Sequence, residues 1–251
     1  MQKHLYILTG GSRGMGLAIA RQLLQAEHEL ICMARHASEA LARAALNADV
    51  ALSQWTQDLS DGEAASERLG HWLERQDPAQ WQSATLINNA GTIPPIVPLS
   101  HAHPKDLAQA LRVGLEAPMQ LSARFLNATE HWNVPRKVLN ISSGLGRKAM
   151  ASQAAYCAAK AGMDHFTRCM AMDEALKPHG AKVCSLAPCV IDTDMQVQLR
   201  SAKSSAFPDQ PRFAQLQTKG LLTSPEEAAR QVLAFLNRPD FGQDPIGDVR
   251  D

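Results

Sequence analysis

Residues 4–16 read His4-Leu5-Tyr6-Ile7-Leu8-Thr9-Gly10-Gly11-Ser12-Arg13-Gly14-Met15-Gly16, an apolar run followed by a glycine-rich turn. An amphipathic segment follows, from about Leu17 to Ala26. A strand, a glycine-rich turn and a helix in this order bring backbone N–H groups and a helix N-terminus up to a diphosphate. Glycine is needed there because a Cβ would block both the tight turn and the close approach of a phosphate. The stretch therefore predicts a dinucleotide-binding unit at the start of the chain.

Apolar, β-rich runs alternate with segments of helical periodicity along the rest of the chain, which is typical of a parallel sheet covered on both faces. Strands are expected near 4–9, 29–34, 50–56, 84–88, 136–142, 181–187 and, weakly, 245–250. Helices are expected near 14–26, 37–47, 61–76, 104–131, 153–177 and 224–237. We therefore expect an α/β fold, a single-domain Rossmann-type doubly wound parallel sheet over residues 1–251, with ligands at the carboxyl ends of its strands.

Charge and hydropathy exclude several classes of partner. Lys and Arg number 25, as do Asp and Glu, and no basic stripe stands out, so neither nucleic acid nor an anionic membrane is expected as a partner. The sequence shows no basic-then-apolar leader and no apolar run approaching the length of a membrane span, which disfavours secretion and membrane insertion.

The cysteines and histidines show no metal-binding pattern. The five cysteines are odd in number and lack metal-like pairing; they are Cys32, Cys157, Cys169, Cys184 and Cys189. Four of them lie in apolar strand or helix contexts, where buried free thiols are expected, and this suits a reducing, cytoplasmic location. His101 and His103 form a pair in a proline-flanked loop without a third ligand nearby. No metal is therefore expected.

Tyr156 and Lys160 lie four residues apart in a predicted helix, so a phenol and an ammonium share one helical face. A phenol is a poor acid–base catalyst near neutrality, and a fixed cation beside it is expected to lower its pKa and make proton exchange with a carbonyl feasible. Ser143 stands thirteen positions before the tyrosine, in Asn140-Ile141-Ser142-Ser143-Gly144. Ser142 competes for the serine role, and the spacing to Tyr156 favours Ser143.

Four motifs occur in a specific order: the glycine-rich turn, Asn88-Asn89-Ala90-Gly91 after the fourth strand, Ser143, and Tyr156 with Lys160. In this combination the chain resembles the short-chain dehydrogenase/reductase family over essentially all of its residues. Within that family it most resembles the sepiapterin reductase and benzil reductase branch. The stretches that suggest the branch are 140–144, 155–157 and 187–196.

The end of the second strand indicates which coenzyme is bound. NAD-preferring Rossmann sites place an acid there to hold the ribose hydroxyls. In this chain Ala34 stands at that place, Arg35 follows it, and the glycine-rich turn supplies Arg13. Two guanidinium groups at the adenosine end favour a 2′-phosphate. The sequence therefore predicts NADP(H).

The resemblance implies the remaining coenzyme contacts. Asp58 and Leu59 match an acid–apolar pair that flanks the adenine, and Ile191 and Thr193 match the positions that hold the nicotinamide amide. The expected coenzyme-binding residues are Gly10, Ser12, Arg13, Gly14, Met15, Gly16, Arg35, Asp58, Leu59, Asn88, Ala90, Gly91, Tyr156, Lys160, Pro188, Ile191 and Thr193.

The expected reaction is the NADPH-dependent reduction of a ketone or diketone, benzil- or sepiapterin-like. Tyr156 is expected to donate a proton to the ketone oxygen, Ser143 to donate a hydrogen bond to it, and Lys160 to bind the nicotinamide ribose. Residues 93–98 form a stiff apolar rim that suits a bulky or aromatic small-molecule substrate. Further apolar walls are expected from Met150, Met195 and Phe207 or Phe213.

Two positions depart from the family pattern. Gly114 stands where the family carries a catalytic asparagine, and Cys189 stands where it usually carries glycine. Pro118 cannot donate a hydrogen bond to the carbonyl four residues before it, so the Gly114 carbonyl is left free. We hypothesise that this carbonyl accepts from a water linked to Lys160 and keeps the proton relay. The plain alternative is that Gly114 and Pro118 only kink a long helix.

Residues 188–219 are long, polar and proline-bearing, which is typical of a substrate lid. The long helices near 104–131 and 153–177 resemble those that pair subunits in the family, so a homodimer or homotetramer is expected. Two other functions stay open. One is a 3-ketoacyl-thioester or hydroxysteroid-type reductase, for which Arg147 and Lys148 are the nearby basic residues. The other is a catalytically lapsed NADP-binding sensor, which Gly114 would favour.

Overall fold

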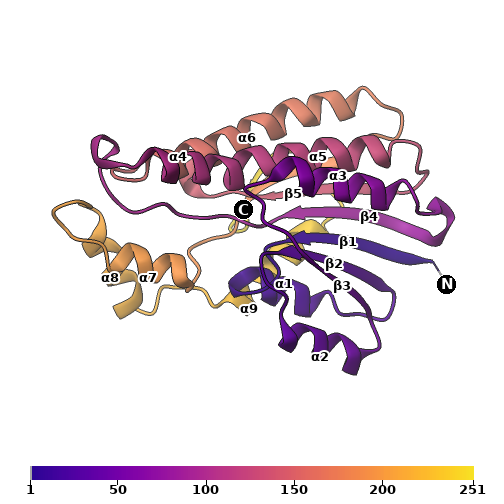
Figure 1. The fold of residues 1–251 in the computed structure, drawn as a ribbon, viewed down its shortest axis with the longest axis horizontal. Coiled ribbons are helices and arrows are strands. Elements are labelled where there is room, and N and C mark those ends of the chain that lie inside the picture. Colours follow the sequence, from indigo (N-terminus) through magenta and orange to yellow (C-terminus); the bar gives the residue numbers. More distant parts are fainter. Residues whose placement is uncertain (1) are drawn as a thin grey trace.

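Seven parallel strands form one sheet in the order β3-β2-β1-β4-β5-β6-β7 in the computed structural model, which describes residues 2–251 (Figure 1). The strands are β1 (Lys3–Thr9), β2 (His28–Ala34), β3 (Ala51–Thr56), β4 (Trp81–Asn88), β5 (Arg136–Ile141), β6 (Lys182–Ala187) and β7 (Ile246–Asp248). The chain runs outward from β1 to β3, then returns to the other side of β1 with β4. This reversal creates the crevice at the carboxyl ends where doubly wound folds bind ligands. The predicted fold class is confirmed, and the weak strand expected near 245–250 is β7.

Helices cover both faces of the sheet. They are α1 (Gly14–Gln22), α2 (Glu39–Ala48), α3 (Gly62–Leu73), α4 (Pro104–Leu111), α5 (Ala117–Ala128), α6 (Ala154–Ala175), α7 (Asp194–Arg200), α8 (Gln210–Thr218) and α9 (Pro225–Leu236). One apolar core joins the sheet to α3, α5 and α6, and a second joins it to α1, α2 and α9. Figure 1 shows the two groups of helices on opposite sides of the strands. No helix within residues 2–251 is long and apolar enough to span a membrane.

Burial explains why the inner strands are continuous apolar runs. Strands β1, β4, β5 and β6 lie inside the sheet and are covered on both faces, so nearly all of their residues are buried. The edge strand β3 has residues that are exposed or half-buried in alternation. Because the long parallel strands end at one edge of the sheet, the segments that follow them meet there.

The single helix expected near 104–131 is interrupted, so that prediction is wrong in its middle. Between α4 and α5, residues 112–116 form a wider turn in which the Ala117 N–H donates to the Arg112 carbonyl five residues earlier. Pro118 follows directly and has no N–H to donate, so the ordinary helical pattern cannot run through this point. The extra residue in the turn places Gly114 against α6.

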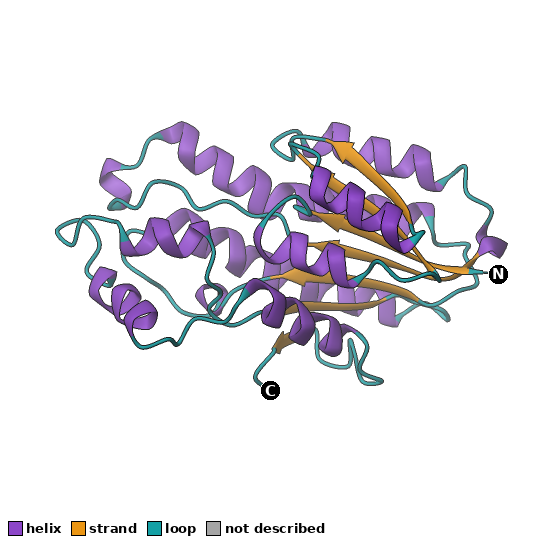
Figure 2. Cartoon of the chain, turned by 90° about the horizontal axis from the view of Figure 1, so that it is seen from below, coloured by secondary structure: helices purple, strands orange, loops and turns teal. Residues whose placement is uncertain are grey.

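The expected lid at 188–219 holds two short helices, α7 and α8, which the sequence did not predict. Figures 1 and 2 show them as a lobe beyond the carboxyl ends of the strands. The two stems of this lobe are joined, since Ile191 and Thr223 form an isolated parallel bridge and the Asp192 N–H donates to the Thr223 carbonyl at 2.9 Å. Phe207 and Phe213 stack inside the lobe with ring centres 5.6 Å apart.

Candidate active site

The glycine-rich turn after β1 adopts the conformation that its sequence predicts. Gly10 and Gly14 have φ angles of 73° and 53°, a region that favours glycine. Gly16 lies so close to the turn that a Cβ would stand 2.1 Å from the Gly10 carbonyl oxygen. Helix α1 begins here after Arg13, without a side chain that caps its N-terminus. Its first N–H groups therefore have no side-chain partner and are available to an anion.

A second set of contacts joins this turn to the end of β4. The Thr9 hydroxyl accepts hydrogen bonds from the N–H groups of Asn89 and Ala90, both at 3.0 Å. The Asn89 side chain donates to the Thr9 carbonyl at 3.0 Å. Neither Thr9 nor Asn89 was predicted as a site residue, although Asn89 lies inside the predicted motif at residues 88–91.

Asn88 lies beneath the site and has little contact with solvent. It is 1% exposed, and its amide donates to the Asn140 side chain at 2.9 Å and the Ser122 hydroxyl at 3.0 Å. The Asn140 amide in turn donates to Thr167 on α6 at 2.9 Å. These bonds join β4, β5, α5 and α6. The Asn88 side chain is therefore buried between the elements that carry the site and holds them together.

Ser143, Tyr156 and Lys160 come from the end of β5 and the first two turns of α6. The Lys160 ammonium is 4% exposed, donates to the Ile141 carbonyl at 2.6 Å and lies 5.8 Å from the centre of the Tyr156 ring. The Ser143 hydroxyl accepts from the Leu145 N–H at 3.1 Å, which leaves its own proton for another acceptor. Ser142 is buried, whereas Ser143 is half-exposed, and this difference supports Ser143 as the serine that meets a substrate.

The pKa of Tyr156 is raised, whereas the sequence predicted that it would be lowered. Burial raises the pKa of Tyr156, and the Ser143 hydroxyl, as a hydrogen-bond partner, opposes the rise. Lys160 is not among the groups that lower it, and the Lys160 ammonium donates to the Ile141 carbonyl at 2.6 Å. Burial lowers the pKa of Lys160 to about 8, and the nearby Asp164 carboxylate opposes that change. Near neutrality the pair is therefore a phenol beside an ammonium.

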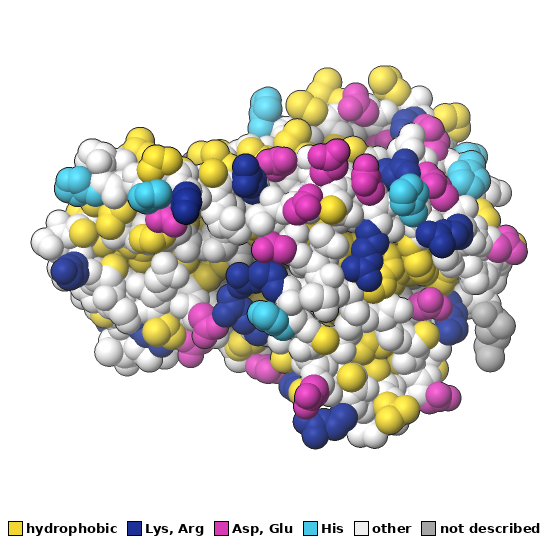
Figure 3. Space-filling model, viewed as in Figure 1, with side chains coloured by type: hydrophobic (Ala, Val, Ile, Leu, Met, Phe, Trp, Pro, Cys, Tyr) yellow, Lys and Arg dark blue, Asp and Glu magenta, His cyan; other side chains and the backbone are white. Residues whose placement is uncertain are grey.

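Basic and acidic side chains lie where the adenosine end of a dinucleotide is expected. A hollow after β2 and β3 is lined by Arg35, His36, Thr56, Gln57 and Asp58. Figure 3 shows Lys and Arg side chains grouped beside a histidine near the middle of one face of the molecule. Hydrogen bonding from the Ser60 N–H, more than the charge of Arg35, lowers the pKa of Asp58. Leu59 is buried in the core and Arg13 pairs with Asp194 at 3.0 Å, so of these predicted residues Arg35 and Asp58 face the hollow.

The segment after β6 crosses over the glycine-rich turn. Thr193 immediately precedes α7, and its methyl group would lie 3.6 Å from a Cβ placed on Gly14. A Cβ placed on Gly91 would lie 3.9 Å from the Lys160 ammonium and 3.8 Å from the methyl group of Met195. The structure thus brings residues 14, 91, 160, 193 and 195 together. Pro188 is buried at the start of this segment, and Ile191 is half-buried at its bridge to Thr223.

Cys189 keeps the backbone conformation of a glycine. Its φ angle is 64°, a left-handed conformation that costs a residue with a Cβ about 1 kcal/mol. Its thiol donates towards the Thr223 hydroxyl at 3.4 Å. The departure from glycine therefore leaves the turn in place and adds a contact to the second stem of the lobe.

Gly114 is buried in the wider turn between α4 and α5. A Cβ at this position would lie 3.1 Å from the Cβ of Ala159, the residue before Lys160. That distance is tighter than an ordinary van der Waals contact, so the helices approach closely because position 114 has no side chain.

The apolar residues that were expected to line a substrate pocket do so only in part. A hollow next to the start of α6 is lined by Pro94, Pro95, Val97, Leu99, His101, Ala102, His103, Asp106, Leu107, Ser152, Ala154 and Ala155. Ile93 and Met150 pack on the apolar cluster of the lobe. Phe207 is fully buried and Phe213 nearly so, so these rings stabilise the lobe and do not face a pocket.

Known proteins resemble the chain over almost its whole length. It is 34% identical over 243 residues to a benzil reductase ((S)-benzoin forming) of Bacillus cereus, covering 97% of this chain and 96% of that protein. It is 30% identical over 249 residues to the sepiapterin reductase of Rattus norvegicus, covering 94% and 92%. These likenesses agree with the branch that the sequence motifs suggested.

Solved structures share the fold. The KRED1-Pglu enzyme superposes with a TM-score of 0.79 at 25% identity, covering 96% of this chain and 98% of that one. A short-chain dehydrogenase/reductase from Burkholderia vietnamiensis superposes with a TM-score of 0.65 at 30% identity, covering 99% of both chains. The family model of the short chain dehydrogenases matches residues 4–204. With its glycine-rich turn, its doubly wound sheet and the serine, tyrosine and lysine at the end of β5 and the start of α6, this chain belongs to the short-chain dehydrogenase/reductase family.

Proposed function

We propose that the protein is an NADPH-dependent carbonyl reductase that transfers hydride to a ketone or diketone, with Tyr156 as the proton donor. One observation carries the proposal: Ser143, Tyr156 and Lys160 converge at the carboxyl edge of the sheet, the edge where the glycine-rich turn leaves the N-terminus of α1 uncapped. A phenol with a serine hydroxyl beside it can stabilise and then protonate an oxygen that gains negative charge.

The coenzyme fits the residues that would hold it. Gly10 and Gly16 let the turn pack tightly on itself and on residues 89–90, and a Cβ on Gly14 would have only the Thr193 methyl group near it. The free N–H groups of α1 would bind the oxygens of a diphosphate. Arg35 is exposed at the hollow after β2, and its guanidinium would pair with a 2′-phosphate. Arg13 would add a second cation by exchanging its surface partner Asp194 for the phosphate, since an exposed ion pair contributes little stability. We therefore propose NADP(H) as the coenzyme.

Bound NADPH supplies the hydride for the carbonyl carbon, and the protein supplies the proton for the oxygen. In our proposal the Ser143 hydroxyl donates a hydrogen bond to the ketone oxygen, and the Tyr156 phenol transfers its proton to that oxygen as the C–H bond forms. The product is an alcohol. We propose that the Lys160 ammonium, 5.8 Å from the centre of the Tyr156 ring, stabilises the phenolate left after proton transfer. The same ammonium would hold the nicotinamide ribose.

Return of a proton to Tyr156 requires a path past Lys160. Pro118 lacks an N–H, so the Gly114 carbonyl has no partner from that residue, and Gly114 packs against Ala159 beside Lys160. We propose that this carbonyl accepts from a water linked to Lys160, in place of the amide that the family carries. A high-resolution crystal structure would contradict this if the carbonyl pointed away from Lys160 with no water between the two.

The expected substrate is a bulky or aromatic ketone or diketone. The hollow beside the start of α6 offers proline, valine and leucine surfaces next to Ala154 and Ala155, the two residues before Tyr156. Relatives named as benzil reductase and sepiapterin reductase support the same class. We propose that residues 188–219 act as its lid, because the Gln198 side chain on α7 donates to the Pro94 carbonyl at 3.1 Å and so connects the lobe to the apolar rim.

Exposed apolar side chains and free cysteines bear on the oligomeric state of the protein and on its cellular location. Large apolar side chains of α4, α5 and α6 are exposed, namely Leu111, Met119 and Met172. We propose that these helices pair subunits in a homodimer or homotetramer, which sedimentation of the purified protein would test. The five cysteines are free, which supports a reducing cytoplasm as the location.

Coenzyme oxidation against a panel of substrates tests the function directly. NADPH consumption would be followed with benzil-like diketones, pterin diketones and acetoacetyl thioesters, and with NADH in parallel. Tyr156→Phe should abolish turnover and leave NADPH binding nearly unchanged, because only the proton donor is lost. Tyr6→Phe is the matched control, since Tyr6 is the chain's other tyrosine and lies in β1. Equal rates for wild type and Tyr156→Phe would overturn the assignment.

One structural observation weakens the runner-up, a thioester reductase. That function needs a basic entrance for a phosphopantetheine carrier, and Arg147 was one of the two residues that could provide it. The Arg147 guanidinium donates to Asp164 at 3.3 Å and to the Gly247 carbonyl at 2.7 Å, so it already has partners. A rate with acetoacetyl thioesters above that with diketones would favour this runner-up.

A further inference from the structure

A buried carboxylate lies one helical turn beyond Lys160, and the proposed chemistry does not use it. Asp164 on α6 is 2% exposed. One of its oxygens accepts from the Ser185 hydroxyl on β6 at 2.7 Å, and the other accepts from the Arg147 Nε at 3.3 Å. Burying a carboxylate is costly unless it is both hydrogen-bonded and paired with a cation. Asp164 meets both conditions.

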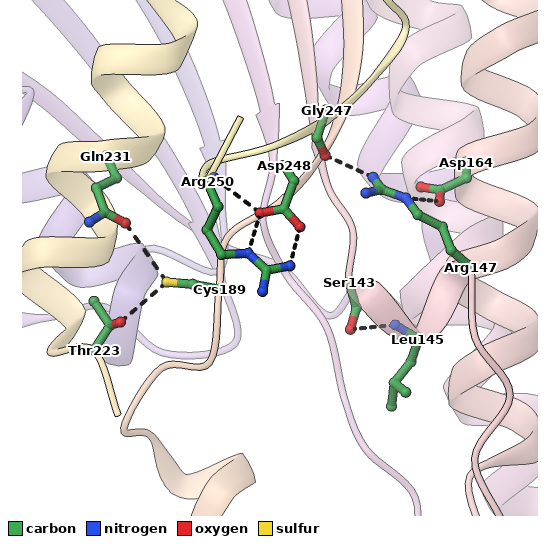
Figure 4. Close-up of polar contacts among 10 residues, drawn as sticks. All are labelled: Ser143, Leu145, Arg147, Asp164, Cys189, Thr223, Gln231, Gly247, Asp248 and Arg250. Carbon is green, nitrogen blue, oxygen red and sulfur yellow. Dashed lines mark hydrogen bonds and ion pairs between the residues drawn. The ribbon is translucent and has the colours of Figure 1, made fainter. Parts of the chain in front are cut away.

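Arg147 connects this carboxylate to two other parts of the chain. It stands four residues after Ser143, just beyond the short 3₁₀ turn Gly144–Gly146, and its Nη2 donates to the Gly247 carbonyl on β7 at 2.7 Å. Figure 4 shows the guanidinium between Asp164 and Gly247, with Ser143 at the other end of the same loop. Its side chain is 30% exposed, so water screens the ion pair only in part. One guanidinium therefore joins the Ser143 loop, α6 and the last strand.

The loop that it anchors lies directly on the helix. A Cβ on Gly146 would stand 2.9 Å from the Asp164 carboxylate and 2.9 Å from the Lys160 carbonyl, so position 146 has room for glycine only. The contact falls on the turn of α6 that carries Lys160. Ser143 begins this loop, and its hydroxyl is oriented by the Leu145 N–H inside it. The placement of the serine hydroxyl thus depends on how the loop seats on α6.

The same carboxylate acts on Lys160 through its charge. Asp164 raises the pKa of Lys160, against the lowering by burial, and so favours the ammonium form. Arg147 forms an ion pair with this anion and Lys160 interacts with its charge, so part of the buried charge is balanced.

We propose that Arg147 and Asp164 are positioning residues of the active site, whose ion pair holds the Ser143 loop on the turn of α6 that bears Lys160. The inference rests on the proposed function for its kinetic part. Neither residue touches the reacting atoms. Loss of the pair would let the loop shift, and displacement of a catalytic group by about 1 Å costs on the order of 100-fold in rate.

Three variants and a control test the proposal. Asp164→Asn keeps the shape and the hydrogen bond from Ser185 but removes the charge, Arg147→Gln removes the guanidinium, and Arg147→Lys keeps a cation. Arg124→Gln is the control, because Arg124 also makes an ion pair, with Glu74 at 2.6 Å, between α5 and α3. For each protein, kcat and KM for the best diketone, NADPH affinity, and amide hydrogen exchange in residues 143–148 would be measured.

We expect Asp164→Asn and Arg147→Gln each to lower kcat by roughly 10- to 100-fold with little change in KM or NADPH affinity. Exchange in residues 143–148 should become faster in both. The double variant should be no worse than either single variant, because the two residues act as one unit. Arg147→Lys should recover part of kcat, and Arg124→Gln should match wild type.

Three results would overturn the proposal. The first is a folded Arg147→Gln variant whose kcat and hydrogen exchange equal those of wild type. The second is a double variant in which the two losses of kcat multiply, and the third is a fall in melting temperature in the single variants with kcat unchanged. If Asp164→Asn does not fold, Arg147→Gln decides alone, since its side chain reaches the surface. If the wild-type protein reduces no ketone, the proposed function fails, and the exchange measurements still determine whether the pair holds the loop.

Discussion

Replacement of Lys160 by methionine should change the free energy of unfolding in a pH-dependent way. The value for the variant minus that for wild type should be higher at neutral pH than at high pH. Lys160 is 4% exposed, and burial lowers its pKa from 10.5 to about 8. Between these two values the unfolded chain binds a proton that the folded protein does not, so the stability of wild type rises with pH across this window. Below about pH 8 both states are protonated, and the folded protein carries the full cost of a buried ammonium.

The size of the effect follows from the two pKa values. At about 1.4 kcal/mol for each pH unit, the interval between 10.5 and about 8 corresponds to about 3 kcal/mol. Methionine has no such cost, but its introduction leaves the Ile141 carbonyl without the 2.6 Å hydrogen bond, a loss of about 1–3 kcal/mol that does not depend on pH. The difference in unfolding free energy, variant minus wild type, should therefore fall by about 3 kcal/mol from about pH 7 to about pH 11.

Urea unfolding of both proteins at a series of pH values would measure this difference. The pH dependence of all other groups is shared and cancels in the subtraction. Lys137→Met serves as a control, because Lys137 also donates to a backbone carbonyl, that of Leu236 at 2.7 Å, but is less buried. Its pKa is also lowered by burial, and its variant should show a weaker trend. A Lys160→Met difference that stays constant with pH would refute the reasoning.

Three further predictions concern the coenzyme and the lid. Gly16→Ala should abolish NADPH binding in fluorescence titrations, because the new Cβ would lie 2.1 Å from the Gly10 carbonyl oxygen; retained affinity would show that the turn can relax. Arg35→Ala should weaken NADPH roughly 10- to 100-fold and NADH little, as loss of a charge-assisted hydrogen bond predicts, and equal losses for both would argue against a 2′-phosphate contact. Phe207→Ala should destabilise the folded lobe by about 3–5 kcal/mol, because a buried ring is removed. Hydrogen exchange in residues 194–218 should become faster and KM should rise, whereas exchange at the wild-type rate would contradict the role of the Phe207–Phe213 stack.

Much of the site was predictable because its determinants are local in sequence. The glycine-rich turn follows a strand and precedes a helix, so the positive φ angles of Gly10 and Gly14 could be expected from residue type alone. The four-residue spacing of Tyr156 and Lys160 placed them on one face of α6 before any tertiary contact was known. Parallel strands end at one edge, so motifs that follow strands had to meet there.

Other features depend on contacts between distant segments and left no local signal. Phe207 and Phe213 looked like pocket walls, but the helices of the lobe bury them against each other. The interruption of the helix expected near 104–131 was suggested by Pro118, yet the form of the wider turn at Gly114 depends on how closely Ala159 approaches. The pKa of Tyr156 is raised by burial and lowered in part by its hydrogen bond with Ser143, and the spacing of the residues cannot specify either effect.

The amino-acid sequence by itself determined the class of fold, the glycine-rich turn and the identity of the three catalytic candidates, because hydrophobic periodicity, glycine and helical spacing act over a few neighbouring residues. Only the tertiary structure decided that Asp164, Ser185, Arg147 and Gly247 meet behind Lys160. Those residues come from α6, β6, a loop and β7, and the packing of the sheet against α6 is what brings their charges and hydrogen-bonding groups within reach of one another.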